Sequence, residues 1–345
     1  MDDASTPVTV KSAFSSLKAA GYPRNYIERL LPDWWDNSLF KTSAGALQFA
    51  LILKQRLGLE ASFDFDGHLL IQENVGIARF KRRADTEESE LNVAAGVGMA
   101  IAKLALFCTT TPYTPLPLDP KQLREEILEI NSSTYVDFEG LLMLCWMHGI
   151  PVLYLKDLPR ASKRMTGMAL SVDGRPAIVL GFGSTQHPRQ LFVLAHELGH
   201  IISGHLGDNG ILIDEDIAEV TDTLIESNNR RKDTEEREAD AFALAVIRNG
   251  HSNPLSAIGR LGSSTALAAK AAVLGQQLGI DPGHLILSYA KEHNDWARAN
   301  QALEYSPAQS SAIDVVGRFF REGVSLEALS EENQAYLLSI QGFGE

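Results

Sequence analysis

The chain has 345 residues, with 45% hydrophobic and 22% charged residues, a composition typical of a globular protein of about two domains. This excludes a disordered chain, a collagen-like chain and a small disulfide-bonded chain. The formal net charge is −13, and an acidic surface repels phosphate backbones, so non-specific nucleic-acid binding over the whole molecule is not expected.

The cysteines and the apolar segments indicate a cytoplasmic protein. Cys108 and Cys145 lie in apolar runs without metal-type spacing, which predicts buried thiols in a reducing compartment. The first residues are acidic and polar and lack the pattern of a signal peptide. The longest apolar stretch, residues 91–108, is interrupted by Asn92 and Lys103, so it predicts a buried helix rather than a membrane span.

The N-terminal third of the chain predicts mainly helices. Residues 43–57 form one of them, with Ser43 as its cap and Gly58 as its stop. Residues 61–80 alternate loosely between apolar and polar and contain Asp66-Gly67, a hairpin signal. Four prolines in residues 109–120 favour a linker. We therefore expect a helical N-terminal region, residues 1–110, that recognises a partner or senses a signal.

The remainder predicts helices around a small sheet. Two apolar runs, 168–172 and 176–180, flank Asp173-Gly174, a strong hairpin signal. A strand is expected at 151–155, and helices at 121–130, 138–148, 190–203, 235–247, 265–277, 282–292 and 324–340. This order predicts an α+β fold, with a domain over 119–250 and a helical C-terminal module over 251–345.

The informative motif is His196-Glu197-Leu198-Gly199-His200 on a predicted helix. Residues four apart share one helix face, so His196 and His200 can bind a common metal ion. Zinc suits two imidazoles, and another divalent metal is the alternative. Zinc lowers the pKa of a water molecule to about 7, and Glu197 is placed to act as the general base. The alternative is a pair of histidines on an ordinary surface helix, which the surrounding apolar residues disfavour.

A third ligand is expected from the following predicted helix. Glu236 and Asp240 are four residues apart, so Glu236 can bind the metal while Asp240 accepts the far N–H of a ligating histidine. His205 is about half a turn out of phase with His196, and Glu238 points to another face. A solvated, acidic start of a helix remains the alternative.

The run from Pro188 to His200, followed by Glu236-x-x-Ala239-Asp240-x-Phe242-Ala243, resembles the ImmA/IrrE family of zinc metallopeptidases. The resemblance covers roughly residues 120–300 and implies a zincin-like fold with a small antiparallel or mixed sheet. It implies His196, His200 and Glu236 as zinc ligands, Glu197 as general base, and Asp240 at a family position for Asp or Asn. The family's Leu-Met-Pro ending is replaced by residues 245–248, and residues 1–110 have no clear counterpart.

The resemblance implies a zinc endopeptidase that cuts a regulatory protein, such as a helix-turn-helix repressor or an antitoxin-like partner, in a stress response or in transcription regulation. The rival hypotheses are a non-catalytic binding protein on a zincin scaffold and, less favoured, direct DNA binding. Residues 176–180 are the expected edge strand for an extended substrate. An oxyanion donor is left open among Tyr135, Tyr154, His148, His187 and His251, and the oligomeric state is not predicted.

Overall fold

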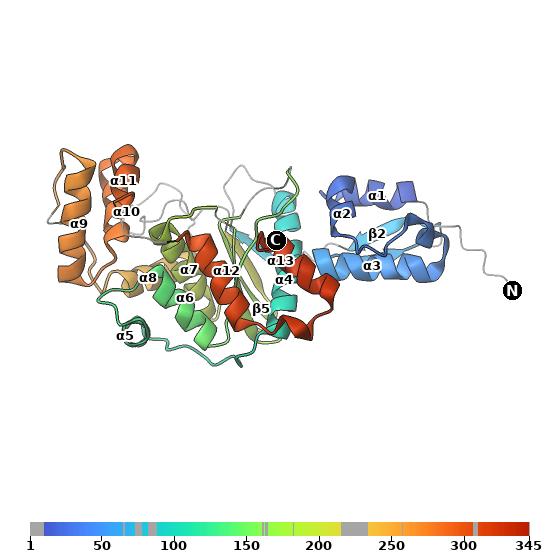
Figure 1. Ribbon diagram of the computed structural model, residues 1–345, viewed down its shortest axis with the longest axis horizontal. Helices are drawn as coiled ribbons and strands as arrows, with labels where there is room; N and C mark the ends of the chain where they lie inside the picture. Colours follow the sequence, from blue (N-terminus) through green and yellow to red (C-terminus); the bar gives the residue numbers. More distant parts are fainter. Residues whose placement is uncertain are drawn as a thin grey trace.

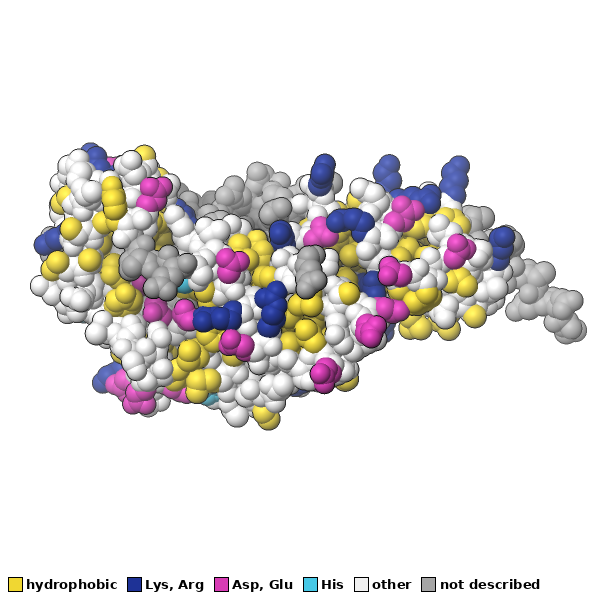
Figure 2. All heavy atoms as spheres, viewed as in Figure 1, with side chains coloured by type: hydrophobic (Ala, Val, Ile, Leu, Met, Phe, Trp, Pro, Cys, Tyr) yellow, Lys and Arg dark blue, Asp and Glu magenta, His cyan; other side chains and the backbone are white. Residues whose placement is uncertain are grey.

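The computed structural model places an N-terminal unit at one end of an elongated molecule, a sheet with its helices in the middle, and the helices of residues 264–303 at the other end (Figure 1). It describes residues 10–64, 66–72, 78–81, 88–160, 162, 165–181, 183–214, 234–256, 258–305 and 310–344. Acidic and basic side chains are interspersed along the face shown in Figure 2.

The N-terminal unit contains helices and a hairpin, as the sequence predicts. Its elements are α1 (Val10–Ala19), α2 (Arg24–Leu30), η1 (Asn37–Lys41), α3 (Ser43–Leu57), β1 (Glu60–Phe63) and β2 (Leu69–Gln72). Strands β1 and β2 pair antiparallel. The cap of α3 is Thr42 rather than Ser43, because the Thr42 hydroxyl accepts the Gly45 N–H. Gly58 ends α3 in the left-handed region, at φ 65°.

An aromatic core holds this unit together. The rings of Phe40 and Phe49 pack edge to face with centroids 4.7 Å apart, and Trp35 contacts both rings. Such pairs stabilise by roughly 0.5–1.5 kcal/mol beyond the area that they bury. The tryptophans of this region thus serve packing, with Trp34 partly exposed at the rim.

Helix α4 (Glu88–Cys108) joins the N-terminal unit to the sheet (Figure 1). Residues 91–108 are long and apolar enough to cross a membrane, but most of this stretch is buried against the sheet and α3. A Cβ on Gly96 would lie 2.4 Å from the Leu57 carbonyl oxygen, so α4 and the end of α3 touch through their backbones. Helix α4 is therefore packed as a core helix of the molecule.

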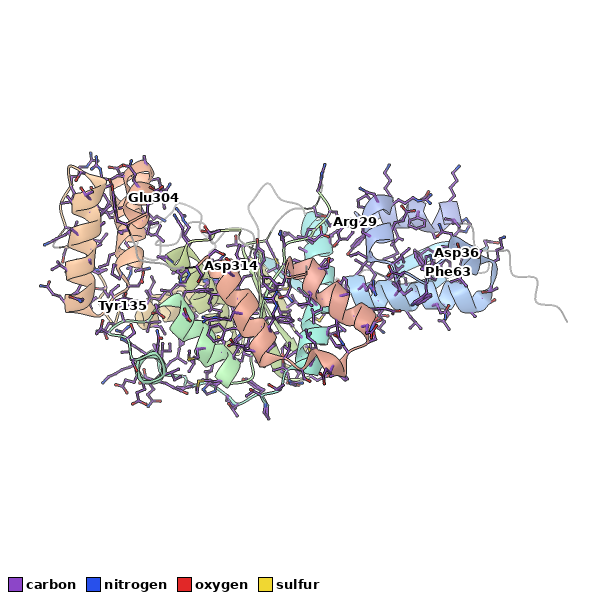
Figure 3. The ribbon with its side chains drawn as sticks, in the orientation of Figure 1. Arg29, Asp36, Phe63, Tyr135, Glu304 and Asp314 are labelled. Carbon is purple, nitrogen blue, oxygen red and sulfur yellow. The ribbon has the colours of Figure 1, made fainter. Side chains whose placement is uncertain are left out.

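The N-terminal unit also contacts the centre through polar side chains. Arg29 and Asp157 form an ion pair with an N–O distance of 3.1 Å, and the Tyr26 hydroxyl donates to the Asp157 carbonyl. Figure 3 shows Arg29 at this junction. The unit is thereby attached to the centre at a second place besides α4.

The central sheet is mixed and has the strand order β3-β7-β5-β6-β4. Its strands are β3 (Ala78–Lys81), β4 (Val152–Tyr154), β5 (Gly167–Val172), β6 (Arg175–Leu180) and β7 (Ile211–Asp214). The β5–β6 hairpin turns at Asp173 and Gly174, both with positive φ, as the Asp-Gly signal predicts. The small mixed sheet confirms the predicted α+β fold.

The expectation that residues 176–180 form an edge strand is wrong. Strand β6 lies inside the sheet, between β5 and β4, and the two edges are β3 and β4. Pro176 fits there because β4 is short and pairs only with residues 178–180 of β6. Pro176 therefore does not have to donate a hydrogen bond to β4.

Helices cover the sheet and form the end of the molecule opposite the N-terminal unit (Figure 1). They are α5 (Pro120–Asn131), α6 (Phe138–Met147), α7 (His187–Ile202), α8 (Thr234–Ile247), α9 (Ser264–Leu278), α10 (Pro282–His293), α11 (Trp296–Leu303), α12 (Ala312–Gly323) and α13 (Glu331–Gln341). The predicted helix over 324–340 is wrong in its first half. Val324 instead forms a β-bridge with Thr109, and the short η2 (Leu326–Ala328) precedes α13.

The edge strand β3 comes from the region before residue 110, whereas the other four strands follow residue 150. The sheet thus draws on both sides of the proline-rich segment. The division into residues 1–110, 119–250 and 251–345 stays a prediction.

Candidate metal centre

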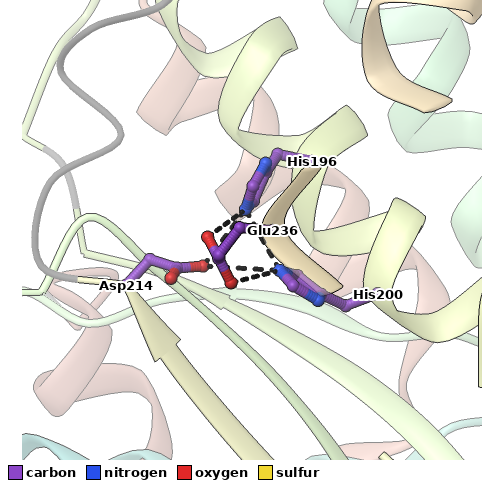
Figure 4. A group of neighbouring side chains, drawn as sticks. All are labelled: His196, His200, Asp214 and Glu236. Atoms are coloured by element: carbon purple, nitrogen blue, oxygen red, sulfur yellow. Dashed lines mark hydrogen bonds and ion pairs between the residues drawn. The ribbon is translucent and has the colours of Figure 1, made fainter. Parts of the chain in front are cut away.

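Four side chains from three elements converge beside the central sheet (Figure 4). His196 and His200 come from α7, Asp214 from the end of β7, and Glu236 from the first turn of α8. Each offers one ligand atom, and these atoms all lie within 4.8 Å of one another. The structure therefore brings His196, His200 and Glu236 together, as the sequence predicts, and adds Asp214.

The histidine pair is buried because α7 lies against the sheet. His196, Glu197 and His200 are all within the buried part of this helix, which packs on β5 and β6. Their Nε2 atoms are 3.1 Å apart. A helix with apolar residues on more than one side is typical of an interior position, so the motif occupies a water-poor environment.

A glycine allows α8 to approach α7. A Cβ on Gly199 would lie 2.9 Å from the Cα atom of Ala239, closer than real Cβ atoms come. The two helix backbones therefore meet at this point. Glu236 lies one turn before Asp240 on α8, so the close approach brings both carboxylates to the histidine pair.

Each imidazole is held from behind by a hydrogen bond at its Nδ1 atom. His196 Nδ1 lies 2.9 Å from Asp240 Oδ1, and His200 Nδ1 lies 2.9 Å from His205 Nδ1. His205 Nε2 is in turn 2.9 Å from Glu238 Oε2. Such partners fix the tautomer and direction of a ligating imidazole. His205 and Glu238, the competing ligands in the sequence, thus lie behind His200.

Glu236 approaches both imidazoles from α8. Its Oε2 atom lies 3.6 Å from His196 Nε2, and its Oε1 atom lies 3.4 Å from His200 Nε2. A tetrahedral zinc ion with bonds of about 2.0–2.2 Å has ligand atoms about 3.3–3.6 Å apart. Two imidazole nitrogens and a carboxylate at these spacings fit zinc or a similar divalent metal.

The carboxylates alter the protonation of His196. Burial lowers its pKa, but hydrogen bonds to Asp214, Asp240 and Glu236 outweigh burial and hold the pKa well above the usual range. In the metal-free protein a proton therefore competes with a metal ion for His196.

Glu197 lies fully buried against the start of β5. A Cβ on Gly167 would fall 2.0 Å from Glu197 Oε1, so only glycine leaves room for this carboxylate. Within the described part of the chain, neither Glu197 oxygen has a partner at ordinary hydrogen-bond geometry. Burial, and then the negative charge of Asp214, raise the pKa of Glu197 well above its usual range.

The residues left open as oxyanion donors lie outside the metal cluster. His148 bonds to Glu126, and His187 at the start of α7 bonds to the Ser310 carbonyl. Tyr154 is on β4, the edge farthest from β7, and Figure 3 shows Tyr135 near the α9 end of the molecule. His251 is exposed beyond the end of α8.

A comparison with family models identifies the segment that carries this centre. Residues 145–249 match the model described as the IrrE N-terminal-like domain, peptidase family M78. This segment, less than a third of the chain, is thus similar to the IrrE-type peptidase domain. All four residues of the metal cluster lie inside the matched segment, which we call the IrrE-like domain, and so does Asp240. The family supports a metallopeptidase-type function for this domain.

Comparisons of the whole chain with curated proteins and with solved structures gave no match.

Proposed function

We propose that the IrrE-like domain is a cytoplasmic zinc endopeptidase that cuts one peptide bond in a regulatory protein. The substrate class is a transcriptional repressor of the helix-turn-helix type or an antitoxin-like regulator. The observation that carries the proposal is the convergence of His196, His200 and Glu236, with the carboxylate of Glu197 beside them. The match of residues 145–249 to the IrrE N-terminal-like domain supports the same reaction class.

The side chains of the centre have two roles: some would bind the metal, and Glu197 transfers a proton. His196, His200 and Glu236 would hold the metal, which supplies Lewis acidity to a substrate carbonyl when it is bound. Asp240 and His205 keep the two imidazoles directed at the cluster. Glu197 takes the proton of the attacking water and returns it to the leaving amine nitrogen. Its raised pKa brings the carboxyl nearer the pH at which a group both accepts and donates a proton well.

The N-terminal unit is a proposed recognition element. Its Arg29 forms an ion pair with Asp157 of the IrrE-like domain. A partner bound to the N-terminal unit would therefore be held near the metal centre. The formal charge of −13 supports a protein partner over nucleic acid.

The rival is a binding protein that uses a zincin scaffold without catalysis. Such a protein has no need of a carboxylate buried beside the metal residues, because burying Glu197 costs free energy. The presence of Glu197, and of Gly167 that makes room for it, favours the peptidase.

The test compares two variants with the wild-type chain. Glu197→Gln is expected to keep the metal and abolish cleavage, whereas His196→Ala is expected to lose the metal. Proteomics of cells that carry Glu197→Gln would show the uncleaved partner accumulating, with the wild-type cells as the matched control. Cleavage that persists in Glu197→Gln would contradict the proposed mechanism.

A further inference from the structure

Asp214 approaches the histidine pair as closely as Glu236 does (Figure 4). Its Oδ2 atom lies 3.3 Å from His196 Nε2 and 3.8 Å from His200 Nε2. Asp214 is 3% exposed, so its carboxylate is held among these groups rather than in water. A buried carboxylate at these distances has the chemistry and the position of a metal ligand.

The distances between the ligand atoms fit a metal site with four protein ligands rather than three. The distances of His196 to His200, Asp214 and Glu236 are 3.1, 3.3 and 3.6 Å. The distances of His200 to Glu236 and Asp214 are 3.4 and 3.8 Å. These are close to the edges of about 3.3–3.6 Å that four ligands make around a tetrahedral zinc ion. A site with four protein ligands is closed, whereas a catalytic site keeps one position open.

Strand pairing on both sides fixes the backbone of Asp214. Asp214 pairs with Gly167 of β5 and with Lys81 of β3, and its carbonyl accepts the Thr166 N–H at 2.6 Å. Gly167 is also the residue against which Glu197 rests. The sheet therefore holds Asp214 close to the histidine pair and opposite the glycine against which Glu197 rests.

Strand β7, which ends at Asp214, lies inside the sheet. Residues 78–81 of β3 pair with it on one side and β5 pairs with it on the other, so a peptide has no free side of β7 to which it can add. This second feature, independent of the ligand distances, means that a substrate cannot reach the metal residues by adding a strand to β7.

We propose that Asp214 is a fourth protein ligand that closes the metal site in the resting protein, so that the peptidase is latent until this carboxylate is displaced. The inference rests on the proposed function, since it concerns the same metal. Displacement would break one metal–carboxylate contact and leave the other three residues to hold the ion, so one position would open without loss of the metal.

The test uses the full chain loaded with Co2+, whose visible absorption reports the ligands around it, and azide as the probe of an open position. The wild-type spectrum is expected to be unchanged by azide. Asp214→Ala is expected to respond to azide and to bind Co2+ at least tenfold more weakly in competition with a chelator. Asp208→Ala is the matched control, because it removes an exposed carboxylate just before β7 and is expected to behave as wild type.

The outcomes separate this inference from the proposed function. A wild-type spectrum that responds to azide as strongly as that of Asp214→Ala overturns the fourth ligand but leaves the three-ligand site intact. A cobalt-loaded Asp214→Ala that ignores azide also overturns it. If Asp214→Ala does not fold, Asp214→Asn, which keeps the shape with a weaker ligand, is measured instead. A wild-type chain that binds no Co2+ overturns the inference and the proposed function together.

Discussion

Gly199 of α7 and Ala239 of α8 face each other with no room for a side chain between them, since a Cβ on Gly199 would lie 2.9 Å from both the Cα atom and the carbonyl oxygen of Ala239. This contact sets the distance between the histidine pair on one helix and Glu236 and Asp240 on the other. The metal centre thus depends on the packing of two helices as well as on its ligands.

The substitution Gly199→Ala is expected to push α8 away from α7. Overpacking at a tight backbone contact costs about 1–3 kcal/mol in the free energy of unfolding. The displaced Glu236 and Asp240 are expected to lower zinc affinity by roughly 10–100-fold. Chelator competition and urea denaturation measure the two effects. Gly262→Ala is the control, because a Cβ there meets no atom within 4 Å. Equal zinc affinity in both variants would show that the helix contact does not set the site.

The substitution Gly167→Ala is expected to act on Glu197 alone. The new methyl group occupies the place of Glu197 Oε1, so the carboxylate has to move while the metal residues stay. We expect zinc content to match wild type and the cleavage rate of the trapped partner to fall by roughly 10²–10⁴-fold, the usual contribution of a positioned general base. Loss of zinc together with activity would mean that Gly167 supports the ligands rather than the base.

The substitution Asp240→Ala removes the support of His196. Without an acceptor at Nδ1, the imidazole loses its fixed tautomer and direction, and zinc affinity is expected to fall by about 10–100-fold. His205→Ala is expected to have a similar effect through His200. Zinc titration against a chelator measures both, with Asp208→Ala as the control for a lost carboxylate. Unchanged affinity in Asp240→Ala would leave that residue without a role at the centre.

The buried His284 on α10 makes the free energy of unfolding depend on pH. Burial, and then the positive charge of Arg248, lower the pKa of His284 from 6.5 to about 3. His284 Nε2 accepts a hydrogen bond from Arg248, which requires the neutral ring. Below about pH 6.5 the unfolded chain binds a proton that the folded chain does not. Stability is therefore lost as pH falls from 6.5 towards 3, by about 1.4 kcal/mol per unit.

Asp281 opposes this effect, since burial raises its pKa to about 7 and its contribution is lost as pH rises from 3.8 to 7. The difference between His284→Gln and wild type isolates the histidine. Urea denaturation is expected to show that difference shifting by about 2 kcal/mol in favour of the variant between pH 7.5 and pH 5.0. His251→Gln, at an exposed histidine, is the control. A difference that does not change with pH would mean that folding leaves the pKa of His284 unchanged.

Local sequence patterns predict much of this fold. His196 and His200 are four residues apart, and so are Glu236 and Asp240. Residues four apart lie on the same face of a helix, so each pair can be placed from the sequence. Asp173-Gly174 demands a tight turn between two apolar runs, and this hairpin forms as expected. These features could be predicted because each depends on residues that are close together in the sequence.

The features that the sequence did not predict depend on contacts between distant segments. Asp214 ends a four-residue strand whose partner β3 lies more than a hundred residues earlier, and nothing near Asp214 marks it as a ligand. Strand β6 is interior because of β4, a three-residue strand with a parallel partner. His205 is out of phase with His196, so spacing along a helix excludes it as a ligand, yet the turn after α7 places it behind His200.

The most direct test of the central claim is the zinc content of the purified full-length chain, measured by elemental analysis for the wild type, Glu197→Gln, His196→Ala and Glu236→Ala. The account predicts close to one zinc ion per chain in the wild type and in Glu197→Gln, and substantial loss in the other two variants. Full zinc content in His196→Ala or Glu236→Ala would contradict a metal centre built from these side chains.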